Sequence, residues 1–111
     1  MSNNINVDAI MTGMATAFQP DKAAGADAVV QYNLTGDGGG EFYATIKEGK
    51  LEMAKGKAAA PKLTLTMDIN DFVAMNSGQL NAMAAFSSGK LKLGGDMMFA
   101  MKLAPMFGRS T

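Results

Sequence analysis

The sequence predicts an α+β fold, a five-stranded, mostly antiparallel sheet covered by about four to five helices. Between residues 27 and 67, apolar and polar side chains alternate with a period of two, which is typical of strands with one buried face. The segments before and after this region have the helical period instead. The chain has 111 residues, of which 48% are hydrophobic, so we expect one core and a single domain over residues 1–111.

The first helix is expected between Val7 and about Phe18. Asn6 can accept a hydrogen bond at its N-terminus, and apolar residues recur at helical spacing along one side. The helix should end at Gln19, because a residue that precedes a proline, here Pro20, avoids helical geometry.

Four strands follow at short spacing, and we expect them to form an antiparallel meander with one buried face. We interpret the glycine-rich segment 36–40 as a hairpin turn. It lacks the Lys-Ser/Thr ending of a phosphate-binding loop, and a strand follows it instead of a helix. Glu48-Gly49 is a second, tight hairpin signal. The predicted strands are residues 27–35, 42–47, 51–55 and 63–67.

The pattern then returns to the helical period. Asp68 and Asn81 can cap two short helices, which Gly78 and Gly89 should close. Residues 90–93 alternate again and supply the fifth strand, which must pair with a strand distant in sequence.

The final helix, capped by Asp96 and running from Met97 to about Phe107, is apolar almost all round. Its only charged residue is Lys102, whereas a surface helix normally has one polar face. A domain of this size has little room to bury a helix completely. We therefore expect one side of this helix to contact the core and another to contact an apolar ligand or partner.

Several classes of function are disfavoured by composition. The chain has no His and no Cys, which removes the common nucleophile–base pairs and the usual ligands of zinc and iron–sulfur centres. Ten basic and ten acidic residues cancel, and no basic cluster points to nucleic acid. Several carboxylates lie at helix starts, where they complement the helix dipole. We expect a protein that is not an enzyme, with no cofactor, no metal site and no nucleic-acid partner.

Methionine is the most unusual feature, with eleven in the chain. A flexible, polarizable side chain can fill irregular gaps in a core, and it can also line a pocket that adapts to ligands of varied shape. The clustering of methionines in the last helices favours the pocket. Burying a long alkyl chain gains on the order of 10 kcal/mol before ordering costs, so such a wall needs no charged anchor.

Five short motifs, taken in order, resemble a known family. They are residues 43–50 (YATIKEGK), 63–67 (LTLTM) followed by Asp71-Phe72, 77–81 (SGQLN), 85–96 (AFSSGKLKLGGD) and 100–103 (AMKL). In order and spacing they are similar to the sterol carrier protein 2 (SCP-2) domain family, over about residues 27–107. The chain departs from eukaryotic members in having no peroxisomal C-terminal tripeptide.

The resemblance implies a hydrophobic tunnel between the sheet and the helices, partly closed by the C-terminal helix. It also implies an intracellular lipid-binding or lipid-transfer protein that holds fatty acids, acyl-CoAs, phospholipids or sterol-like molecules without catalysis. Carried over by position, the ligand-binding residues are Phe72, Met75, Leu80, Met83, Phe86, Met98 and Met101.

Two other functions remain open. The apolar C-terminal helix could pack on a partner subunit, including a second copy in a homodimer, and make the chain a non-catalytic interaction module. Less favoured is a small enzyme that uses Asp, Lys or Tyr on a lipid. Lys90 and Lys92 fit either a solvated edge strand or a transient contact with anionic membranes. No secretion signal or membrane-spanning run is visible, so we expect a cytoplasmic protein.

Overall fold

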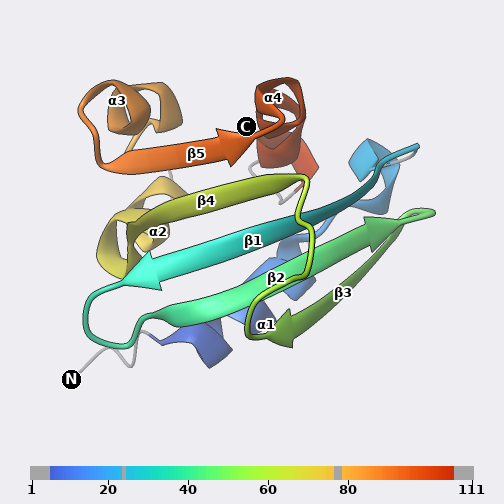
Figure 1. Cartoon of the computed structure of the whole chain (residues 1–111), viewed down its shortest axis with the longest axis horizontal. Helices are drawn as coiled ribbons and strands as arrows, with labels where there is room; N and C mark the ends of the chain where they lie inside the picture. The colour runs from blue at the N-terminus through green and yellow to red at the C-terminus, as the bar shows by residue number, and fades with distance from the viewer. Residues whose placement is uncertain (1–5, 24, 77–78, 107–111) are drawn as a thin grey trace.

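The computed structural model describes residues 6–23, 25–76 and 79–106, which form a sheet with helices on one face and one edge (Figure 1). The predicted fold class is confirmed: this part of the chain contains a five-stranded sheet, four α-helices and one short 3₁₀ helix, η1. The elements are α1 (Val7–Ala17), η1 (Pro20–Ala23), β1 (Asp27–Thr35), β2 (Gly40–Lys47), β3 (Lys50–Lys55), β4 (Leu63–Asp68), α2 (Ile69–Asn76), α3 (Ala82–Ser87), β5 (Leu91–Gly95) and α4 (Met97–Met106).

The strand order is β3-β2-β1-β4-β5, and one pairing corrects the sequence-based expectation. Strands β1, β2 and β3 form the expected antiparallel hairpins, and β5 pairs with β4 in the antiparallel sense. The expected four-strand meander is wrong at β4, which lies beside β1 in the parallel sense instead of beside β3. The sheet is therefore mixed, with three antiparallel pairings and one parallel pairing.

The connection from β3 to β4 explains this topology. To reach the far side of β1, residues 56–62 cross the sheet on the face opposite the helices (Figure 1). Gln31, only 4% exposed, holds this connection with its side-chain amide. Its Nε2 donates to the Gly56 carbonyl at 3.1 Å, and its Oε1 accepts from the Ala58 N–H at 2.7 Å. A buried amide thus satisfies backbone groups that the strands themselves leave unpaired.

All four predicted N-terminal helix caps are present, whereas Gly78, which was expected to close the second helix, lies outside the described residues. In each case a carboxylate or amide oxygen accepts a backbone N–H from the first turn, where such donors lack intrahelical partners. The bonds run from Ala9 N to Asn6 Oδ1 (2.8 Å), Asn70 N to Asp68 Oδ2 (2.8 Å), Ala84 N to Asn81 Oδ1 (3.1 Å) and Phe99 N to Asp96 Oδ1 (3.0 Å).

The glycine-rich segment is the predicted hairpin turn between β1 and β2. The Gly39 N–H donates to the Gly36 carbonyl at 3.0 Å. A Cβ on Gly39 would collide with the Leu34 carbonyl oxygen, so this position requires glycine. The Gly38 carbonyl accepts the Val7 N–H at 3.1 Å, which docks the start of α1 on the turn.

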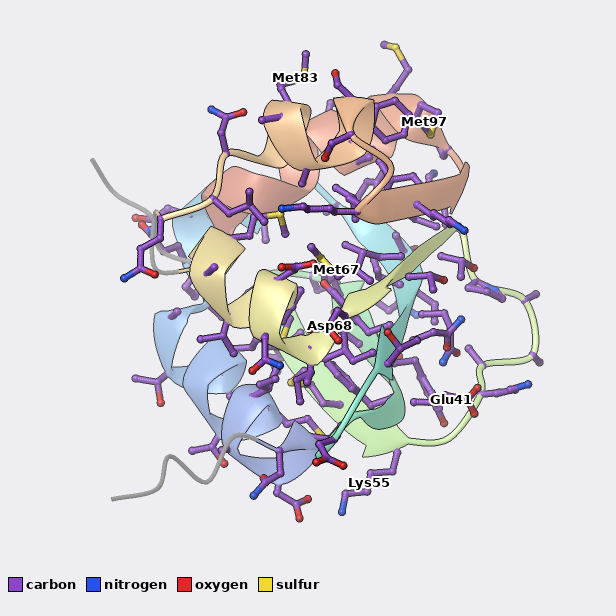
Figure 2. The ribbon with its side chains drawn as sticks, turned by 90° about the vertical axis from the view of Figure 1, so that its left-hand side faces the viewer. Glu41, Lys55, Met67, Asp68, Met83 and Met97 are labelled. Atoms are coloured by element: carbon purple, nitrogen blue, oxygen red, sulfur yellow. The ribbon has the colours of Figure 1, made fainter. Side chains whose placement is uncertain are left out.

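Each helix packs on a different part of the sheet. Helix α1 packs on β2, α2 on β1 and β4, and α4 on β4 and β5, while α3 packs on the edge strand β5. Figure 2 shows α1 and α2 on the left of the sheet and the β3–β4 connection on the right. The sheet thus has an inner face toward the helices and an outer face under the connection.

Candidate functional site

The candidate site is the apolar layer, which we define as the side chains between the inner face of the sheet and the helices. Strand register sets its floor. Tyr32 of β1 lies opposite Phe42 of β2 and Leu65 of β4, and all three are buried. The rings of Tyr32 and Phe42 stack with their centroids 4.8 Å apart. The other buried floor residues are Ala28, Val30, Leu34, Ala44, Ile46, Leu63, Met67 and Leu91.

The helices supply the opposite wall of the apolar layer. Phe72 of α2 meets the edge of the Tyr32 ring at a centroid distance of 5.7 Å, which links the two walls directly. Sheet and helix residues belong to one continuous buried cluster. The buried helix residues are Val7, Ile10 and Met14 from α1, Ala23 from η1, Ile69 and Phe72 from α2, Ala85 from α3 and Phe99 from α4.

The described part of the apolar layer contains no charged side chain. Gln31 is the one buried polar residue among the described residues, and it serves the outer face. Burial raises the pKa of the Tyr32 hydroxyl far above its usual value, so this group stays neutral in the physiological range. Within residues 6–23, 25–76 and 79–106, no group of acidic residues is arranged to hold a metal ion.

Helix α4 is tied to the sheet by a polar junction at its start. The Phe99 N–H donates a hydrogen bond to the Asp96 carboxylate. This bond, together with the nearby ammonium of Lys62, holds the pKa of the Asp96 carboxyl below its usual value. The Lys62 Nζ lies 3.6 Å from Asp96 Oδ2 and 5.8 Å from the centroid of the Phe99 ring. The Asp96 N–H also donates to the Lys62 carbonyl at 2.9 Å. This junction fixes where α4 begins relative to β4.

The seven predicted ligand-binding residues fall into two groups. Phe72 is buried in the apolar layer, and Met75 and Leu80 are half-buried and pack against it. By contrast, the side chains of Met83, Phe86 and Met98 are exposed, with exposed fractions of 75%, 46% and 73%. The side chain of Met101 lies outside the described part of the structure.

The sheet contributes residues that the sequence-based selection left out. Tyr32, Phe42 and Met67 form much of the floor of the apolar layer, and Met14 of α1 adds a buried methionine to its wall. The seven predicted residues were carried over by position from the family resemblance, and none of them lies in a strand. The alternation of apolar and polar side chains along β1, β2 and β4 is the sequence signal that marks these floor residues.

This chain is similar in sequence and in structure to known proteins of one family. The sequence model described as the SCP-2 sterol transfer family matches residues 9–108. Hydroxysteroid dehydrogenase-like protein 2 of Xenopus tropicalis is 34% identical over 82 residues, which are 73% of this chain and 20% of that protein. The chain therefore spans about a fifth of the length of these curated relatives.

Two solved structures of similar size have the same fold. The sterol carrier protein domain 2 of Helicoverpa armigera has a TM-score of 0.77 and 27% identity, covering 94% of this chain and 88% of that chain. The palmitated SCP2L2 of Aedes aegypti has a TM-score of 0.71 and 27% identity, covering 92% of this chain and 94% of that chain.

Among the described residues, no helix has the length and apolar character that crossing a bilayer requires.

Proposed function

The chain belongs to the SCP-2 sterol transfer family, and on that premise we propose that it is a cytoplasmic carrier that binds a lipid in the apolar layer. The ligand would be a fatty acid, an acyl-CoA, a phospholipid or a sterol-like molecule. The palmitated state of the Aedes aegypti relative favours the fatty acid among these. Transient contact with membranes would load and unload the carrier.

The observation that carries the proposal is the chemistry of the apolar layer. Its described residues offer aliphatic, aromatic and thioether groups to a ligand, and no charge. Met14 and Met67 are buried in it, and Met11, Met53 and Met75 pack against it. Thioether side chains change shape at little cost, so they can separate to admit an alkyl chain and close behind it.

The energetics are sufficient without a polar anchor. Each ligand methylene that leaves water for the apolar layer gains about 0.8 kcal/mol, so a fatty-acid chain gains on the order of 10 kcal/mol. Part of this gain offsets the ordering of the ligand and the opening of the layer. A micromolar dissociation constant needs only about 8 kcal/mol net.

The proposed carrier is not an enzyme. The chain has no His and no Cys, and two of its carboxylates, Asp68 and Asp96, are engaged as helix caps. The match covers about a fifth of the dehydrogenase-like relatives, so their names give no reason to expect a dehydrogenase reaction here.

Native mass spectrometry and titration with a fluorescent fatty acid test this function. We expect a one-to-one adduct of lipid mass after exposure to palmitate, and competition between palmitate and the probe. Met75→Lys, which places a charge at the apolar layer, should weaken binding at least about tenfold. Asn70→Lys, an exposed position on the same helix, is the matched control and should bind normally. A protein that takes up no fatty acid, phospholipid or sterol contradicts the proposal.

One observation favours the interaction module as the alternative. Met97 and Met98 in the first turn of α4 are exposed, at 42% and 73%, so this turn is free to contact something outside the chain. If that partner were a second copy, the lipid-free protein would sediment as a dimer and take up no lipid.

A further inference from the structure

The large apolar side chains that remain exposed are concentrated in one region. Among the described residues, Met83 and Phe86 of α3 and Met97 and Met98 of α4 are the exposed large hydrophobic residues. Both helices pack on the edge strand β5. Figure 1 shows α3 and α4 along the same edge of the molecule, and Figure 2 places Met83 and Met97 on the same side. We call these four side chains the edge patch.

Three lysines accompany the edge patch. Lys90 and Lys92 are exposed on the segment between α3 and α4; because Leu91 is buried on the inner face, strand alternation places Lys92 on the outer face of the edge strand β5. Lys102 is exposed one helical turn after Met98, so the two side chains share one side of α4. None of the three lysines forms an ion pair with a residue in the described ranges.

Charge is distributed unevenly along the chain. Nine of the ten acidic residues precede Phe72, and the one that follows, Asp96, is paired with Lys62. Residues 82–102, which carry the edge patch, contain Lys90, Lys92 and Lys102 against the single acidic residue Asp96, so this segment has a net positive charge although the whole chain is neutral. An edge that carries both exposed apolar side chains and exposed lysines fits an anionic bilayer, whose interface accepts the apolar groups while its headgroups attract the ammonium groups.

We propose that the edge patch, with Lys90, Lys92 and Lys102, is the surface by which this protein docks on anionic lipid membranes. A second copy of the chain fits the same surface less well, because a two-fold contact would bring the same lysines of both copies together. The docking surface adjoins the apolar layer, because Ala85 of α3 and Phe99 of α4 are buried in that layer. The inference extends the proposed carrier function, but docking can be measured without it.

Vesicle co-sedimentation tests the docking surface. The protein should bind vesicles of phosphatidylcholine mixed with phosphatidylglycerol, bind pure phosphatidylcholine vesicles weakly, and dissociate as salt is raised. Each lysine near an anionic surface is worth roughly a fivefold change in binding, so Lys90→Gln with Lys92→Gln should weaken binding about twenty-five-fold. Lys47→Gln with Lys50→Gln is the matched control at the opposite edge, in the β2–β3 hairpin, and should change binding little.

Met83→Gln with Met98→Gln tests the apolar contribution at positions too exposed to affect folding. This pair should weaken vesicle binding on the order of tenfold. If Lys47→Gln with Lys50→Gln weakened vesicle binding as much as Lys90→Gln with Lys92→Gln, the inference would be overturned. Normal vesicle binding by the Met83→Gln, Met98→Gln variant would also overturn it. A dimer that the methionine pair converts to monomer, without vesicle binding by either form, would assign the patch to self-association and also overturn it.

Uptake of fluorescent fatty acid without vesicles separates the two proposals. Normal uptake together with no vesicle binding rejects the docking surface and leaves the carrier function. Vesicle binding that depends on the edge lysines, together with no uptake, rejects the carrier function and leaves the docking surface.

Discussion

Replacing Phe72 tests the central contact of the apolar layer. The ring is 2% exposed and meets Tyr32 at 5.7 Å, so Phe72→Ala removes both buried area and an aromatic pair. Truncations of this kind cost about 3–5 kcal/mol in a ligand-free core. If the layer admits a lipid, an alkyl chain can occupy the vacated space, and a ligand at about 100 times its dissociation constant restores about 2.7 kcal/mol.

Urea unfolding followed by circular dichroism, with and without palmitate, measures both quantities. Phe72→Leu is a milder variant that should lose only about 1 kcal/mol and remain folded if the alanine variant does not. Tyr43→Ala is the control, because Tyr43 lies opposite Gln31 on the outer face and is only half-buried. A loss below about 1 kcal/mol for Phe72→Ala would refute its packed position. Unfolding curves that palmitate leaves unchanged would refute the layer as the lipid site.

The remaining predictions concern the elements that hold the layer in place. Gln31→Ala should cost about 2 kcal/mol and lower the melting temperature by about 8 °C, because backbone groups of the β3–β4 connection lose their partner; an unchanged melting temperature contradicts this. The pKa of Asp96 is lowered on folding, so its stabilising effect is complete above about pH 5 and is lost as the pH falls through that lowered value. Asp96→Asn should flatten the dependence of the unfolding free energy on acid pH, and an equally steep curve would count against the α4 junction. Gly39→Ala should destabilise the fold by at least about 1 kcal/mol, whereas Gly13→Ala, which meets no atom within 4 Å, should stabilise α1 by about 0.5–1 kcal/mol in the same thermal assay.

Local signals in the sequence predicted local structure well. Each capping residue, such as Asn6 or Asp96, acts within three residues of itself, so its effect is independent of the tertiary fold. The Glu48-Gly49 turn is equally local: both residues have positive φ, and Lys47 pairs directly with Lys50. Features of this kind can be predicted because the residues that cause them are neighbours in the sequence.

The pairing of β4 could not be predicted in the same way. The alternation in residues 63–67 shows that one face is buried, but it is the same whichever strand lies alongside. The deciding contact joins Gln31 to residues 56 and 58, about 25 positions away. Gln31 occupies the outer-face position of its strand, where an exposed polar residue is the ordinary expectation. Only the crossing connection turns it into a buried amide.

The methionines illustrate the corresponding limit for the site. Met67 and Met83 have identical side chains, yet one is 3% exposed on the floor of the apolar layer and the other 75% exposed on α3. Helix α3 is short and packs mainly on an edge strand, so one side of it has no protein to cover it. A count of methionines therefore combines two populations: those buried in the apolar layer, where we propose that a lipid binds, and those exposed on α3 and α4, which we propose contact a membrane. The proposed lipid transfer requires both lipid binding and membrane contact, and because the two populations are separate, substitutions can disable either one while the other is retained.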